Sequence, residues 1–254
     1  MLIGAFLITI LFTSNLANAA DRDIYQIITY NISGEKQEKR MDIFLKDAYL
    51  PALHRAGIKD VGVFKPVESD EDAGKKIYVL IPFKSIDQFE KLEAVLSKDT
   101  KYQKDGSDYI DAAHDNSPYL RMESTLLRAF KTWPEYKKPT HSTPETEQVY
   151  ELRSYEGATE KLYTKKVEMF DSGETKLFKD LGFQPVFFGE VISGPTMPNL
   201  MYLTTFKNKA SQDELWNAFR IAPAWLKLKA DKQYANTVSK NVKRYLRPTK
   251  YSDL

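Results

Sequence analysis

Residues 148–155 read QVYELRSY, and residues 23–30 read DIYQIITY. Both runs are short and rich in tyrosine and in β-branched or apolar residues, a composition typical of β-strands. Their tyrosines recur at the same positions, and such self-similarity indicates an internal repeat. The matching tyrosines are Tyr25 with Tyr150, and Tyr30 with Tyr155.

Each predicted strand is followed by an amphipathic segment, at residues 36–56 and 159–181, with apolar residues at helical spacing. Gly57 and Gly182 end the two segments at the same offset as the tyrosines. A glycine at this place predicts a helix C-cap with a positive φ.

A second pair of strands repeats as well. IYVLIPFKS at residues 77–85 resembles LMYLTTFKN at residues 200–208, which aligns Tyr78 with Tyr202. Each half then continues with a second helical segment and a last strand. The predicted order in both halves is therefore β-α-β-β-α-β, the split βαβ order of a ferredoxin-like unit, and the fold class is α+β.

A proline-containing linker at residues 132–147 separates the halves, because its prolines remove backbone donors and it lacks apolar periodicity. The expected domains are residues 21–131 and residues 148–248. Each sheet carries helices on one face, so its other face needs a partner. We expect the two tandem ferredoxin-like units to face each other in one intrachain α+β barrel.

Strand alternation predicts where the polar residues of the second half point. If Tyr150 and Leu152 pack under the helices, then Glu151, Arg153 and Tyr155 face the barrel interior. Tyr30 is expected on the opposite wall. A mixed polar and aromatic lining indicates a ligand cavity. The alternative is that Glu151 and Arg153 form a structural ion pair or face water at a sheet edge.

Two further residues are candidates for the same site. Glu174 follows a glycine inside a helical segment, which indicates close packing and places Glu174 near the barrel mouth; the alternative is a solvated glutamate. His114 lies in a long irregular segment, where functional residues are common, although a plain loop histidine explains it equally simply. The acidic run of residues 68–72 is expected to be a solvated hairpin tip.

Composition excludes several function classes. The 254 residues carry a formal net charge of +2 and no cysteine. Without a basic stripe no nucleic-acid binding is expected, and without cysteine there are no disulfides or thiolate metal sites. The three histidines lack the spacing of a metal site, so neither metal nor cofactor is expected.

Residues 1–20 have the pattern of a secretory signal peptide. They contain no charged side chain, and an apolar run from Leu2 to Phe12 precedes Ala17-Asn18-Ala19, which fits a signal-peptidase site. We expect an exported, periplasmic or secreted protein, with no stable membrane insertion after cleavage. The alternative is an uncleaved hydrophobic anchor.

The second half contains the motifs VYELRSY, LFKDLGFQPVFFGE, MPNLMYLTTFKN, and WNAF followed by PAW. Together these motifs resemble the NIPSNAP family. The resemblance covers residues 149–246, and the first half is similar more loosely, through IYQIITY and IYVLIPFKS. Ala222 stands before Pro223 where family members often have an acidic residue.

The resemblance implies a dimeric α+β barrel fold, and a homo-oligomer is compatible with it. Proteins of this superfamily include cofactor-independent monooxygenases, isomerases and haem-degrading enzymes, so the fold alone does not fix a function. The expectation is a protein that binds a small apolar or aromatic ligand in a barrel cavity. The alternative is a cofactor-independent monooxygenase or isomerase.

Overall fold

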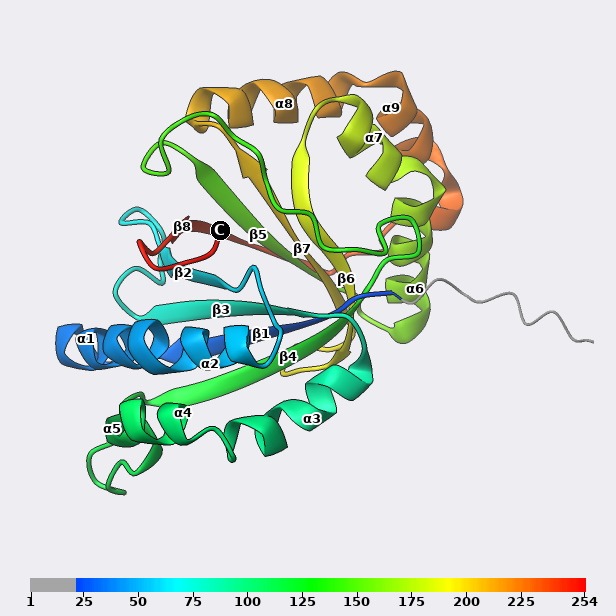
Figure 1. The fold of residues 1–254 in the computed structure, drawn as a ribbon. Coiled ribbons are helices and arrows are strands. Elements are labelled where there is room, and N and C mark those ends of the chain that lie inside the picture. The colour runs from blue at the N-terminus through cyan, green and yellow to red at the C-terminus, as the bar shows by residue number, and fades with distance from the viewer. Residues whose placement is uncertain (1–21) are drawn as a thin grey trace, which may run out of the picture.

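The computed structural model describes residues 22–254, so the predicted signal peptide lies outside the described residues. The described chain forms a closed antiparallel barrel of eight strands, in the order β1-β3-β2-β8-β5-β7-β6-β4. Figure 1 shows helices α1–α5 on one outer side of this barrel and α6–α9 on the other. Across the same residues, no helix is both long and apolar enough to cross a membrane. The predicted α+β barrel, closed within one chain, is confirmed.

The first half contains four strands and two helical segments. Its elements are β1 (Ile24–Asn31), α1 (Glu35–Ile43), the π-helical turn η1 (Phe44–Tyr49), α2 (Leu50–Arg55), β2 (Gly62–Pro66), β3 (Lys76–Phe83), α3 (Ile86–Leu96), α4 (Thr100–Asp105), α5 (Ser107–Ile110) and β4 (Arg121–Ala129).

The second half follows the same order. Its elements are β5 (Val149–Glu156), α6 (Glu160–Met169), the π-helical turn η2 (Phe170–Glu174), α7 (Thr175–Asp180), β6 (Gln184–Ser193), β7 (Asn199–Phe206), α8 (Lys209–Ile221), α9 (Pro223–Ala230), the 3₁₀ turn η3 (Lys232–Tyr234) and β8 (Lys240–Pro248).

Matching glycines end the first helical segment of each half. Gly57 and Gly182 have φ angles of 81° and 84°. The amide of Ile58 donates to the carbonyl of Leu53, and the amide of Phe183 donates to that of Phe178. These bonds complete a Schellman-type cap, so the predicted role of both glycines is confirmed.

The barrel interior contains an apolar core. One cluster of buried residues combines side chains from all eight strands, among them Tyr25, Phe64, Tyr150 and Leu152, and no helix contributes to it. Strands on opposite walls of a barrel touch only across its interior, so this cluster fills it. The prediction that Tyr150 and Leu152 pack under the helices is wrong.

The alignment of Tyr78 with Tyr202 is also wrong by one residue. Tyr78 lies opposite Thr29, whereas Tyr202 lies opposite Arg153. Tyr78 therefore faces the barrel interior, and Tyr202 packs under the helices of the second half.

The acidic run between β2 and β3 is not fully solvated. Asp70 Oδ2 accepts a hydrogen bond from the Tyr245 amide at 2.9 Å, and Asp72 Oδ2 lies 2.5 Å from Arg244 Nε. Asp72 is buried. Strands β2 and β8 pair over only a short length. The contacts of this turn with Arg244 and Tyr245 therefore add to the attachment of the first half to β8 at the seam of the barrel.

Candidate functional site

A pocket with a mainly apolar lining lies outside the barrel, between the first-half sheet and its helices. This sheet–helix pocket has a volume of about 550 Å³. Strands β1 and β4 form its floor, and η1, α3, α4 and α5 form its walls. Its lining residues are Gln26, Ile28, Tyr30, Phe44, Tyr49, Phe89, Glu90, Leu92, Glu93, Leu96, Ser97, Tyr102, Gln103, Tyr109, Ile110 and Met122.

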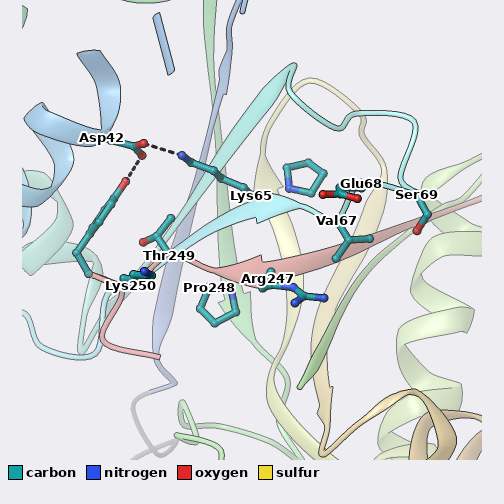
Figure 2. Close-up of a pocket in the computed structure, with 11 residues that line it drawn as sticks. Asp42, Lys65, Val67, Glu68, Ser69, Arg247, Pro248, Thr249 and Lys250 are labelled. Atoms are coloured by element: carbon teal, nitrogen blue, oxygen red, sulfur yellow. Dashed lines mark hydrogen bonds and ion pairs between the residues drawn. The ribbon is translucent and has the colours of Figure 1, made fainter. Parts of the chain in front are cut away.

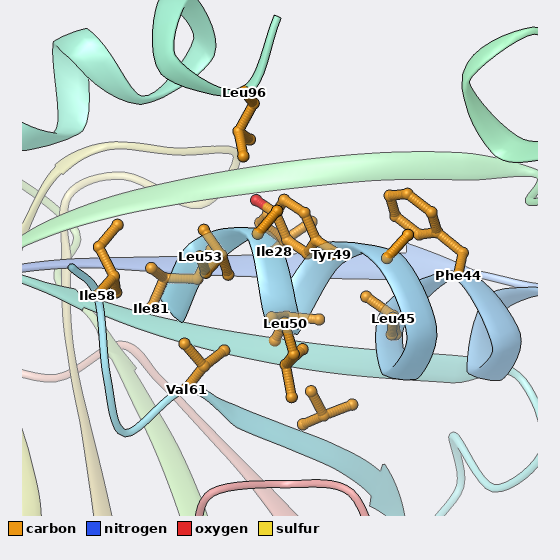
Figure 3. Packing of buried hydrophobic residues seen from close by; sticks show 14 of the residues in the cluster. Ile28, Phe44, Leu45, Tyr49, Leu50, Leu53, Ile58, Val61, Ile81 and Leu96 are labelled. Atoms are coloured by element: carbon orange, nitrogen blue, oxygen red, sulfur yellow. The ribbon is translucent and has the colours of Figure 1, made fainter. Parts of the chain in front are cut away.

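Six aromatic rings dominate this lining. Phe44 and Tyr109 stack with their ring centres 3.7 Å apart, and Phe44 and Tyr49 stack at 5.5 Å. Figure 3 shows Phe44 and Tyr49 on the side of their helix that faces Leu96 of α3. Both rings come from the π-helical turn η1, and π-helical turns in helices are frequent at functional sites.

The tyrosines of the pocket are neutral hydrogen-bonding groups. Burial raises the pKa of Tyr30, Tyr49 and Tyr102 above the usual tyrosine value, and neighbouring tyrosine hydroxyls add to the increase at Tyr30 and Tyr49. Tyr30 and Tyr109 hydroxyls lie 3.5 Å apart. Within residues 22–254, the hydroxyls of Tyr49 and Tyr102 bond to no other residue, and both remain accessible from the pocket. A ligand in the pocket can accept a hydrogen bond from either one.

The corresponding layer of the second half is closed and charged. Glu151, fully buried, accepts hydrogen bonds from Arg153 at 2.6 Å, Gln212 at 2.7 Å and Trp216 at 2.9 Å. Because Gln212 and Trp216 belong to α8, these side chains lie under the helices. The prediction that Glu151, Arg153 and Tyr155 face the barrel interior is therefore wrong, and the alternative of an ion pair between Glu151 and Arg153 is confirmed.

This closed layer extends to Glu174. Arg153 donates to the Tyr155 hydroxyl at 3.0 Å, and that hydroxyl lies 2.9 Å from the Tyr202 hydroxyl. Lys166 lies 5.7 Å from the Tyr155 ring centre and pairs with Glu174 at 2.8 Å. Glu174 is buried, so the alternative of a solvated glutamate is wrong.

The two layers occupy equivalent positions. Gln26, Ile28 and Tyr30 line the pocket, and the residues 125 positions later are Glu151, Arg153 and Tyr155. Tyr30 does not lie opposite the second-half residues across a lumen, as predicted, but in the matching layer of the first half. The ligand-binding role of these residues stays a prediction.

His114 lies apart from both layers. It is exposed and lines a separate polar depression of about 440 Å³ together with Arg40 and Asn116. Arg40 is already bonded to Asp108 Oδ2 at 2.5 Å and to the Asn116 carbonyl at 2.6 Å. The structure does not bring His114 together with the other candidates, and no group of metal-binding side chains occurs in the part of the chain that it describes.

Two other hollows carry less chemistry. A larger groove of about 840 Å³ lies at the β2–β8 seam (Figure 2), where Asp42 already binds both Lys65 at 2.6 Å and the Tyr251 hydroxyl at 2.5 Å. A depression of about 270 Å³ lies at the barrel mouth, where Arg244 is held by Asp72. Each of these hollows is lined by a single aromatic ring, against six in the sheet–helix pocket, so the sheet–helix pocket is the stronger candidate for an apolar or aromatic ligand.

Sequence reasoning missed most of the pocket. Phe44 and Tyr49 fitted the helical spacing of a core, and nothing in their pattern distinguishes a core ring from one that lines a void. Tyr102 and Tyr109 lie in short helices that the sequence did not resolve. One signal for this pocket was available in the sequence. Aromatic residues are dense in the segments that were expected to cover one face of the first-half sheet.

Solved structures share this fold. A candidate monooxygenase from Fusobacterium nucleatum is 9% identical, with 89% of this chain and 92% of that chain covered and a TM-score of 0.60. One from Lactobacillus acidophilus is 11% identical, with 89% and 94% covered and a TM-score of 0.59. An anthrone oxidase-like protein is 12% identical, with 91% and 93% covered and a TM-score of 0.52. At these identities the comparison establishes the α+β barrel fold alone.

The sequence comparison is more specific for the second half. The NIPSNAP family model matches residues 150–253. The second half therefore carries a NIPSNAP domain, and the resemblance that its motifs indicated is confirmed. No curated protein matches the chain.

Proposed function

We propose that this protein binds a small aromatic ligand in the sheet–helix pocket of its first half, and not in the barrel interior. The observation that carries this proposal is the pocket itself, a space of about 550 Å³ lined by six aromatic rings. Apolar walls with few polar groups are typical of small-molecule sites. The unpartnered hydroxyls of Tyr49 and Tyr102 would orient a ligand that carries an acceptor atom.

The arrangement of the halves supports this assignment. We propose that the chain is a tandem of two ferredoxin-like units, at residues 21–131 and 148–248, joined by the linker of residues 132–147. Each unit has the same space between sheet and helices. The second unit fills its space with the Glu151 and Arg153 network, whereas the first unit leaves its space open.

The second candidate is a cofactor-independent oxygenase or isomerase, which the fold shared with candidate monooxygenases favours. Such chemistry needs a base that removes a proton from the substrate. The pocket offers only the carboxylates of Glu90 and Glu93 and tyrosines whose pKa is raised by burial. A binding role is therefore favoured over an enzymatic one. Oxygen uptake in the presence of a bound hydroxyarene would favour the oxygenase instead.

Binding of 2-naphthol, measured by calorimetry, tests the proposal. Met122 lines the pocket and is 45% exposed, so Met122→Trp fills the pocket without disturbing the core. Val95 of α3 is 46% exposed and does not line the pocket, so Val95→Trp is the matched control. We expect Met122→Trp to weaken binding at least tenfold and Val95→Trp to leave it unchanged. Equal binding by both variants, or none by the wild type, would refute the proposal.

Export is a separate proposal, supported by the uncharged apolar run at residues 2–12 and the Ala17-Asn18-Ala19 tripeptide. Intact-mass measurement of protein from its native host tests it. Loss of residues up to Ala19 or Ala20 is expected. A mass that includes Met1 would favour the membrane anchor.

A further inference from the structure

The sheet–helix pocket carries negative charge only. Glu90 and Glu93 are its only charged lining residues, and no lysine, arginine or histidine lines it. Both carboxylates are exposed on α3 at the rim of the pocket. Neither forms an ion pair with any part of the chain between residues 22 and 254. An anionic ligand would therefore meet repulsion without compensation.

The closed layer of the second half shows that cationic groups can be held between the sheet and its helices. The guanidinium carbon of Arg153 lies 3.8 Å from the Trp216 ring centre, and Glu151 neutralises its charge. The Lys166 ammonium lies 4.5 Å from the Phe170 ring centre and pairs with Glu174. The chain thus places two cations between sheet and helices, each against an aromatic ring and beside a carboxylate. Ring faces attract cations in this way.

The first half has aromatic rings in the matching layer but no ion pair there. Gln26 and Ile28 stand at the positions of Glu151 and Arg153, 125 residues earlier. Ser85 caps α3 and Asn208 caps α8, and Glu93 and Trp216 follow their caps at the same distance. The first half therefore has a void with the exposed Glu93 at its rim, where the second half has the Arg153 guanidinium and its indole cover.

We propose that the sheet–helix pocket binds an organic cation, such as an aromatic ring that bears an alkylated ammonium group. This inference rests on the proposed function and names the ligand class for the same pocket. The aromatic rings offer contact to the apolar part and to the cation, and Glu90 and Glu93 balance its charge. The hydroxyls of Tyr49 and Tyr102 remain free to bind an oxygen atom on the ligand.

Two probes of equal shape separate charge from hydrophobicity. They are (4-hydroxyphenyl)trimethylammonium and 4-tert-butylphenol, which differ in one positive charge. Equilibrium dialysis at low and high salt is expected to show the cation binding about tenfold more tightly at low salt, with a smaller difference at high salt because exposed charges are screened. The neutral phenol should show little salt dependence.

Variants at the rim of the pocket test whether the carboxylates of Glu90 and Glu93 cause the preference for a cation. Glu90→Gln combined with Glu93→Gln should weaken the cation about tenfold and leave the phenol unchanged, since both positions are exposed and the fold does not depend on them. Asp87→Asn, on the exposed face of the same helix and outside the pocket, is the control and should change neither. Binding of the phenol as tightly as the cation would overturn this inference and leave the proposed function standing. Failure of both probes to bind would overturn both.

Discussion

The guanidinium carbon of Arg153 lies 3.8 Å from the ring centre of Trp216, so one strand residue and one helix residue close the layer between them. Glu151 holds both, because it pairs with Arg153 and accepts a hydrogen bond from the Trp216 indole. In the first half, the positions of Arg153 and Trp216 are held by Ile28 and Glu93, and the layer stays open. The buried acceptor is missing as well, because Gln26 stands at the position of Glu151.

Arg153→Met should destabilise the protein by about 3–5 kcal/mol, because it leaves the fully buried Glu151 without its cationic partner. Chemical unfolding in urea measures the loss. Lys176→Met removes one partner of an exposed ion pair with Asp180 and should cost less than about 1 kcal/mol. Adding Glu151→Gln to Arg153→Met should recover part of the stability. A loss below about 1 kcal/mol for Arg153→Met would contradict a buried structural pair.

The element order of the two halves could be predicted from the sequence because strand and helix periodicities are local properties. The matching of Gly57 with Gly182 needed no knowledge of the fold. The barrel also followed, since two sheets with bare faces within one chain have an obvious way to cover them.

The direction of the side chains could not be predicted in the same way. Alternation states that Glu151, Arg153 and Tyr155 share a face, but not which face meets the helices. The apolar face points inward, because a closed barrel of eight strands encloses a space just wide enough for side chains to fill. The polar face went under α8, where Gln212 and Trp216 supply the donors that Glu151 needs. Those partners lie some sixty residues away and appear only after folding.

Asp72 makes the stability of the β2–β8 seam dependent on pH. Burial alone would raise its pKa, but the hydrogen bond from Lys76 and the charges of Lys76 and Arg244 outweigh it, so the pKa lies below the usual 3.8. A carboxylate with a lowered pKa in the folded state stabilises the fold above its unfolded pKa and loses this contribution as the pH falls.

The stability advantage of the wild type over Asp72→Asn should therefore be fully present above about pH 5 and should shrink as the pH falls below about 4. Urea unfolding across this range measures it. Asp180→Asn, which removes an exposed carboxylate, serves as the control and should track the wild type. A constant difference between Asp72→Asn and the wild type at every pH would contradict the argument.

Gly57→Ala and Gly182→Ala should each cost about 1 kcal/mol, because an alanine in the left-handed region is strained. A Cβ at either position would meet no atom within 4 Å, so the cost comes from the backbone alone. Asparagine, which tolerates this region better, should cost less at both positions. Thermal unfolding compares the four variants. A much larger loss at one glycine would show that the two caps are not equivalent.

Trp216→Ala should open the closed layer of the second half. Trp216 is buried and covers Arg153, and its indole donates to Glu151, so the expected cost is about 3–5 kcal/mol. The cavity left behind has the shape of the lost ring. The Arg153 cation lies on one side of it, and the Glu151 carboxylate lies nearby as an acceptor. Indole added at millimolar concentration should therefore bind there and restore about 1 kcal/mol by linkage to the folded state. Trp225→Ala, at a partly exposed ring of α9, leaves a site open to water, so indole should not restore its stability. Thermal unfolding of both variants with and without indole makes the comparison. An equal response of the two variants, or no response of a folded Trp216→Ala protein, would show that the layer does not retain an aromatic site when its own ring is removed.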